Sequence, residues 1–193
     1  MIKLFSDGAI ILLFAVLTAL GGLIKLPFLP NHIFTLQIFF PLLAGAFLGR
    51  DRGALSQIMF LVIGILAIPY YNITAAGMPA PAMGTSPTFA RLGLKIGYLL
   101  GYVAAAYLIG TVFEEKKIKN LIPIVVTMLA GLILIYLTGL LTFLVVFRFD
   151  LNILFYRWSL PFVALDALKA TLAGVIYWRT MHIYRSRFSK SIK

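Results

Sequence analysis

The sequence predicts an all-α integral membrane protein, a single bundle of six transmembrane helices with both termini in the cytoplasm. Of its 193 residues, 62% are hydrophobic and only 12% are charged, whereas a soluble domain carries roughly 25% charged residues. Apolar runs of about 20 residues, the length that crosses a bilayer, recur along the chain. Basic residues flank these runs unevenly, which is the pattern that orients helices in a membrane.

Six apolar runs are the predicted spans, and together they form one membrane domain over residues 1–193. The first run is too long for the apolar segment of a cleaved signal peptide, so we interpret it as a membrane helix. The fifth exceeds what a bilayer requires and is expected to tilt or to end in an interfacial turn. The predicted spans are 8–26, 33–49, 53–69, 92–112, 120–147 and 160–179.

The distribution of lysine and arginine predicts the orientation. Six spans place both termini on one side; if that side is cytoplasmic, eleven basic residues lie inside and five outside. This bias agrees with the positive-inside rule. The 26-residue segment from 70 to 95 is then external. The net charge of +11 reflects these flanking residues and does not indicate a nucleic-acid-binding domain.

Several kinds of site are excluded. The chain has no cysteine, and its two histidines, His32 and His182, lie about 150 residues apart, so we expect no disulfide and no metal site. The sequence contains no P-loop, HExxH or GxSxG motif. We therefore expect a protein that is not an enzyme, has no cofactor and does not hydrolyse ATP itself.

Two charges stand within the last span. Asp166 and Lys169 are three residues apart, so they share one helix face. Either charge alone at mid-membrane costs at least ~2.5–3.5 kcal/mol. One interpretation is a self-neutralising pair that orders the bundle, or a lysine that snorkels outward. The other interpretation is a polar site that faces a protein-lined cavity. Counted from Pro161, the pair lies one to two helical turns below the outer surface, a depth that suits a ligand pocket opening outward.

Small residues recur at helical spacing in several spans, where they let helix backbones approach closely. Gly93, Gly97 and Gly101 form one ladder, and Gly45, Gly49 and Gly53 form another. Ala15 and Ala19 are a similar pair on the first span. Each set is interpreted either as internal packing or as a docking surface for another protein, and the alanine pair is the best candidate for docking.

The central part of the sequence contains the motifs TLQ (35–37), LAG (43–45), LG (48–49), GALS (53–56) and IP (68–69). The later part contains SPTF (86–89), GYLLGY (97–102) and DALKA (166–170). In this order the motifs resemble those of BioY, the biotin-binding S component of energy-coupling factor (ECF) vitamin transporters. The resemblance covers nearly the whole chain.

The resemblance implies a multi-pass protein of a bacterial cell membrane. It implies that the protein binds biotin from outside and delivers it with a separate transmembrane coupling protein and two ATPase subunits. Ala15 and Ala19 match the motif through which S components dock onto the coupling protein. Asp166 and Lys169 match positions that hydrogen-bond the polar ring of the ligand, and a ureido group, with two N–H donors and a carbonyl, suits a carboxylate and an ammonium.

Two departures from the family pattern bear on the ligand. The insertion ARLGLKI adds Arg91 and Lys95, and the external segment lacks a glycine-rich run. Arg91 or Lys95, with Arg157 third, is the candidate cation for the carboxylate of biotin; the alternative for the first two is a snorkelling pair at a helix start. Asn72 is a candidate polar contact with the ligand.

The remaining candidates have alternatives of their own. Gln37 either enters the pocket or ties the preceding segment to a neighbouring helix. Aromatic residues are candidate walls for a flat ligand, or else part of an interfacial belt; they are Phe34, Tyr70, Tyr71 and Tyr98. Alternative functions are an importer subunit for another carboxylate vitamin such as lipoate, a membrane scaffold, or an intramembrane enzyme.

Overall fold

The computed structural model describes residues 2–24, 35–66, 87–116, 118–145 and 160–189. The elements of this part of the chain are six helices. They are α1 (Ile2–Leu23), α2 (Phe39–Leu48), α3 (Arg50–Leu66), α5 (Pro87–Lys116), α6 (Leu121–Val145) and α8 (Leu160–Ser189). The predicted all-α fold of six helices is confirmed.

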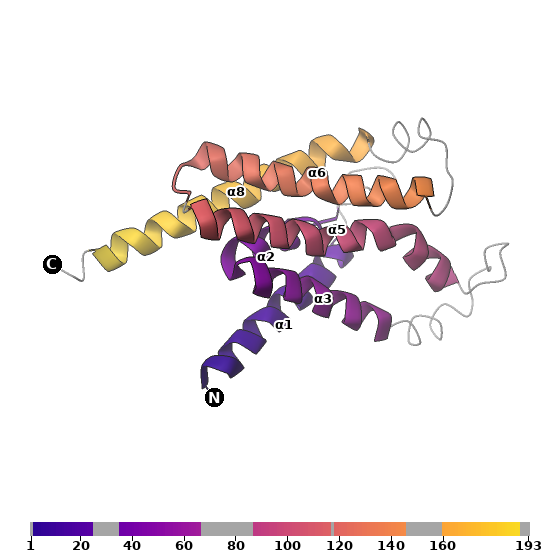
Figure 1. Cartoon of the computed structure of the whole chain (residues 1–193), viewed down its shortest axis with the longest axis horizontal. Coiled ribbons are helices and arrows are strands. Elements are labelled where there is room, and N and C mark those ends of the chain that lie inside the picture. The colour runs from indigo at the N-terminus through magenta and orange to yellow at the C-terminus, as the bar shows by residue number, and fades with distance from the viewer. Residues whose placement is uncertain (1, 25–34, 67–86, 117, 146–159, 190–193) are drawn as a thin grey trace.

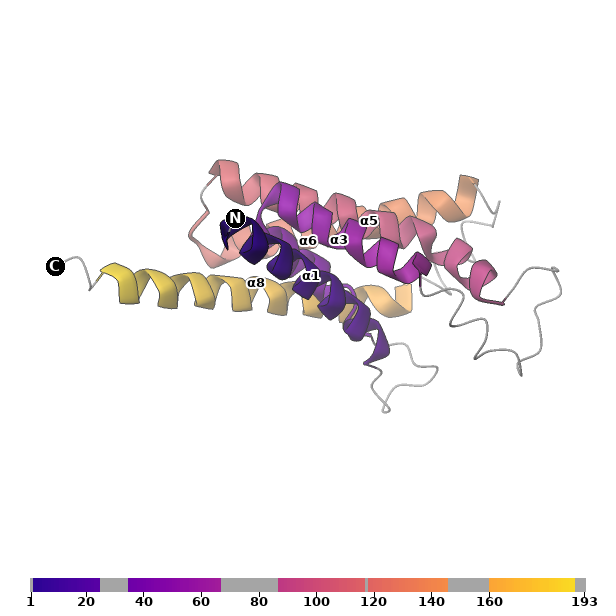
Figure 2. The same ribbon diagram turned by 90° about the horizontal axis from the view of Figure 1, so that it is seen from below.

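Successive helices run in opposite directions along the bundle, and the N- and C-termini lie at the same end (Figure 1). Figure 2, turned by 90°, shows the same arrangement. Six helices that alternate in direction place both termini at the same end of the bundle, as the sequence predicts. Two stretches are long and apolar enough to cross a membrane by length and composition, Ile96–Lys116 and Leu121–Thr142, and Asp7–Leu23 and Phe39–Leu48 are shorter apolar helices. Which end of the bundle faces the cytoplasm stays a prediction.

Four helices extend beyond the predicted spans at one end or both, namely α1, α3, α5 and α8. Helix α8 continues to Ser189, ten residues past the predicted end, because no glycine or proline interrupts the chain after Gly174. Its 30 residues correspond to a rod of about 45 Å, longer than the roughly 30 Å of a hydrocarbon core. Helix α5 begins at Pro87, since proline is well accommodated in a first helical turn.

The shortest helix, α2, forms the centre of the bundle. It has ten residues and contacts each of the other five helices. Its buried residues are Pro41, Leu42, Leu43, Ala44, Gly45 and Ala46. A helix that is apolar on nearly all sides is expected at the core of a bundle rather than at its surface, and the other helices pack around it.

The glycine ladders pack inside the chain. A Cβ at Gly45 would meet backbone atoms of Ala106 on α5, and a Cβ at Gly53 would lie 2.9 Å from the Cα of Gly45. A Cβ at Gly97 would meet the side chain of Thr142 on α6. These positions therefore permit close contact between helix backbones, which is the internal-packing interpretation of both ladders.

The turn between α2 and α3 depends on two glycines and a carboxylate. Gly49 has φ 82° and ψ −174°, a conformation essentially restricted to glycine. The backbone N–H of Arg50 donates to Oε1 of Glu114 on α5 at 3.0 Å, which satisfies a free donor at the start of α3. Gly110 brings α5 against this turn, because a Cβ there would meet the backbone of Arg50.

Gly49→Ala should destabilise the fold. The backbone conformation of Gly49 costs an alanine about 1–3 kcal/mol, and the new Cβ would also meet the carboxylate of Glu114. The thermal midpoint of the detergent-purified variant should fall by several degrees. Gly64→Ala is the matched control, because a Cβ at Gly64 meets no atom within 4 Å. Equal midpoints for the two variants would contradict this account of the turn.

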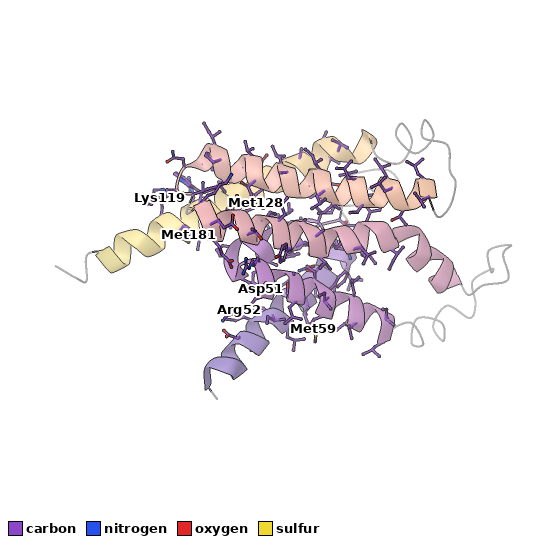
Figure 3. The ribbon with its side chains drawn as sticks, viewed as in Figure 1. Asp51, Arg52, Met59, Lys119, Met128 and Met181 are labelled. Carbon is purple, nitrogen blue, oxygen red and sulfur yellow. The ribbon has the colours of Figure 1, made fainter. Side chains whose placement is uncertain are left out.

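Helix α1 is joined to α3 at two levels. Near the chain terminus, Nη2 of Arg52 lies 2.8 Å from Oδ2 of Asp7; Figure 3 labels Arg52 where α3 approaches α1. Deeper in the bundle the hydroxyl of Thr18 donates to Oε1 of Gln57 at 3.2 Å, and Nε2 of Gln57 donates to Oγ of Ser56 at 2.9 Å. The last three side chains are fully buried, so their polar atoms satisfy one another in place of water.

Candidate functional site

The two charges of α8 form a buried ion pair. Nζ of Lys169 donates to Oδ1 of Asp166 at 2.5 Å. The residues are 3% and 4% exposed, respectively, so the lysine does not snorkel to the surface. The two residues are one helical turn apart, so their side chains can form an ion pair. Both charges are removed from water, and the contacts that they make inside the protein must offset the free-energy cost of that desolvation.

A tyrosine from another helix completes the pair. The hydroxyl of Tyr136 on α6 donates to Oδ2 of Asp166 at 2.7 Å. Oδ1 therefore accepts a hydrogen bond from α8 itself, and Oδ2 accepts one from α6. Tyr136 is not among the predicted site residues; its signal in the sequence is a tyrosine followed by Thr138 and Gly139 in the middle of an otherwise apolar span. One tyrosine among nine does not single itself out without the fold.

Tyr98, a predicted wall residue, lies beside this group. Its ring meets the ring of Tyr136 edge to face, with centroids 5.9 Å apart. The ring of Tyr98 packs over Gly139 of α6, where a Cβ would lie 2.5 Å from Cε1. Tyr102, one turn further along α5, is 5% exposed and lies in the core. The structure thus brings Tyr98 to the charged pair, with the ring edge-on to Tyr136.

The carboxylate of Asp166 retains capacity for further hydrogen bonds. A carboxylate offers about four acceptor positions, and the contacts from Lys169 and Tyr136 use two of them. Hydrogen bonds to a charged acceptor are roughly twice as strong as neutral ones. The chemistry of the group therefore suits a polar ligand with N–H donors.

Gln37 precedes α2 and packs against the last turn of α1. Its Cδ would be 3.3 Å from a Cβ placed at Gly22. The backbone N–H of the neighbouring Leu36 donates to the carbonyl of Gly21 at 3.0 Å. These contacts tie the start of α2 to α1, which is one of the two predicted roles of Gln37.

The structure does not describe the side chains of the other predicted site residues. Arg91 and Lys95 lie on α5, and only their backbone is described. The rest of the set is outside the described residues altogether and stays a prediction: Phe34, Tyr70, Tyr71, Asn72 and Arg157.

The alanine pair of α1 packs inward. Ala15 is fully buried and belongs to the hydrophobic core, and Ala19 packs against that core. The methyl group of Ala15 is covered by the chain itself in this structure, and the docking role of Ala15 and Ala19 stays a prediction. The exposed apolar residues of α1 include Leu12, Leu13, Val16 and Leu20.

The described residues also form a shallow cavity of about 580 Å³ at the turn between α5 and α6. Lys116 and Lys119 line it together with apolar side chains, and Figure 3 labels Lys119 at the end of the bundle that carries the chain termini. Asp166 lies in the other half of the bundle, in the second turn of α8. This cavity is therefore separate from the charged pair.

Comparisons with known proteins agree with one another. The BioY family profile matches residues 3–186. A probable biotin transporter BioY of Pyrococcus horikoshii is 32% identical over 172 residues, which cover 89% of this chain and 93% of that protein. A probable biotin transporter BioY of Lysinibacillus sphaericus is 38% identical over 126 residues, 65% of this chain and 58% of that protein.

A solved structure shares the fold. The crystal structure of the S-component for biotin from an ECF-type ABC transporter matches with a TM-score of 0.70 at 21% identity, and the match covers 93% of each chain. At this identity the likeness concerns the arrangement of helices. The family match and the identity to the Pyrococcus relative decide membership: the chain belongs to the BioY family.

Proposed function

We propose that the protein is the substrate-binding subunit of an ECF-type importer in a bacterial cell membrane and that it binds biotin. The observation that carries the proposal is the buried Asp166–Lys169 pair with its hydrogen bond from Tyr136. The ureido ring of biotin presents two N–H groups and a carbonyl, which suit the chemistry of a carboxylate acceptor beside an ammonium group. The names of the family relatives support the same ligand.

The ends of the bundle fit uptake from outside. With the positive-inside orientation, the termini are cytoplasmic and Asp166 lies in the half of the bundle nearer the exterior. The carboxylate of the biotin tail requires a cation, and Arg91 or Lys95 at the start of α5 is our candidate, with Arg157 third. Asn72, Phe34 and Tyr71 belong to the same proposal as contacts from the external side.

Transport requires partners in this proposal. The sequence has no P-loop motif, so ATP hydrolysis falls to two ATPase subunits, and a transmembrane coupling protein connects them to this chain. Docking on the first helix rests on the family resemblance of Ala15 and Ala19. In this structure that docking would meet the exposed leucines and valine of α1 first, since Ala15 is buried.

Calorimetry on the detergent-purified protein tests the proposal. We expect saturable binding of one biotin per chain with a dissociation constant in the nanomolar range, roughly −12 kcal/mol, because charge-assisted hydrogen bonds to the ureido ring are strong. Lipoate shares the acid tail of biotin but lacks a ureido group, so it should not displace biotin at equal concentration. A folded preparation that binds lipoate in preference to biotin, or binds neither, would overturn the assignment.

A further inference from the structure

The carboxylate of Asp166 is held from two directions. Lys169 lies on the same helix and contacts Oδ1, whereas Tyr136 lies thirty residues away on α6 and contacts Oδ2. The terminal torsion of an aspartate is broad, so a single contact leaves the carboxylate plane free to rotate. Two contacts on opposite oxygens define that plane. The direction of the remaining acceptor positions is therefore set by Tyr136 as well as by Lys169.

Tyr136 is itself fixed by the packing of α5 against α6. Its ring meets Tyr98 edge to face, and Tyr98 packs over Gly139. On the same interface a Cβ at Gly101 would meet the hydroxyl of Thr138 and the Cα of Ile135, so the two helices approach closely on both sides of Tyr136. The hydroxyl therefore has little freedom to leave Asp166. An anchor of this kind holds a binding group close to its productive geometry.

We propose that Tyr136 is a positioning residue for ligand recognition: its hydroxyl orients the carboxylate of Asp166 so that the free acceptor positions meet the two N–H groups of a cyclic urea. This inference rests on the proposed function. Tyr136 acts through Asp166 and acts on the ring end of the ligand, not on its acid tail.

Tyr136→Phe removes only the hydroxyl and tests the proposal by calorimetry. A hydrogen bond to a charged group is worth about one to two powers of ten in an equilibrium constant, so biotin affinity should fall by about tenfold or more. Desthiobiotin keeps the ureido ring but lacks the sulfur ring, and its affinity should fall by the same factor. Tyr107→Phe is the matched control, because Tyr107 is an exposed tyrosine of α5. This variant should bind biotin with the affinity of the parent protein.

Infrared spectroscopy separates positioning from a general loss of packing. The chain has only six aspartate and glutamate residues, so the carboxylate stretch that disappears in Asp166→Asn identifies Asp166. In ligand-free protein this band should shift in Tyr136→Phe and stay in place in Tyr107→Phe. Incorporation of p-aminophenylalanine at position 136 restores a donor and should recover most of the lost affinity, which also covers the case of a poorly folded phenylalanine variant.

The outcomes are distinct. Parent-like affinity of Tyr136→Phe for biotin would overturn the role of Tyr136 while leaving the biotin assignment intact. So would a loss of affinity with an unshifted Asp166 band and no recovery by p-aminophenylalanine. A parent protein that does not bind biotin at all would instead overturn the proposed function.

Discussion

Replacing Asp166 by asparagine should reduce biotin affinity by at least about a hundredfold, because the charged acceptor for the ureido N–H groups is lost. Lys169→Met should have a similar effect, since it removes the donor to the ureido oxygen. Each single variant also removes one member of a buried ion pair, which costs about 3–5 kcal/mol of stability. Calorimetry and thermal unfolding in detergent measure the two effects.

The double variant Asp166→Asn, Lys169→Met distinguishes a binding role from a purely structural one. Removing both charges leaves no unpaired ion, and neutral replacements of a buried ion pair are often no less stable than the pair. We therefore expect the double variant to recover the thermal midpoint of the parent and still not to bind biotin. Recovery of binding together with stability would mean that the pair only orders the bundle.

A control of the same chemistry is available at the surface. Asp51 is a carboxylate in the first turn of α3, with 78% of its side chain exposed, and it pairs weakly with Arg50 at 3.6 Å. Exposed pairs of this kind contribute little to stability. Asp51→Asn should therefore match the parent both in biotin affinity and in thermal midpoint.

The second large effect is expected at Gly45. Gly45→Leu would drive a side chain into the backbone of Ala106, and α2 cannot move aside because it contacts all five other helices. Overpacking a well-filled core typically costs 1–3 kcal/mol, and a collision with backbone exceeds that range, so the folded yield should be close to zero. Size-exclusion chromatography of a fluorescent fusion measures the monodisperse fraction.

Gly64→Leu on α3 provides the comparison. The exchange is the same, but a Cβ at Gly64 meets no atom within 4 Å, so the elution profile should resemble that of the parent. If both leucine variants gave similar yields, the helix crossing at Gly45 would not be limiting for the fold.

The sequence was sufficient to predict the six helices because the length and composition of each apolar run indicate a helix without reference to the rest of the chain. The Asp166–Lys169 pair was predictable for the same reason: both residues lie within one helical turn. Tyr136 was not, because its partner lies on another helix and nothing in the local pattern marks that contact. Pairing between helices depends on which faces meet, and one sequence does not specify those faces.

Ala15 shows the same limit from the other direction. The spacing of Ala15 and Ala19 permits a close helix contact, but it does not say whether the neighbour belongs to the same chain. The structure shows Ala15 within the core. The extent of α8 was also missed, because hydropathy indicates where a membrane would end and not where backbone hydrogen bonding ends.

The continuity of α8 has a practical consequence. One helix carries Asp166 in its second turn and continues to Ser189, at the end of the bundle that holds the termini (Figure 1). A regular helix turns as a unit along its length. A spin label or fluorophore on the exposed Thr180 is therefore a remote reporter of the segment that carries Asp166. It should register reorientation of that segment when biotin is added, without any modification near the proposed site.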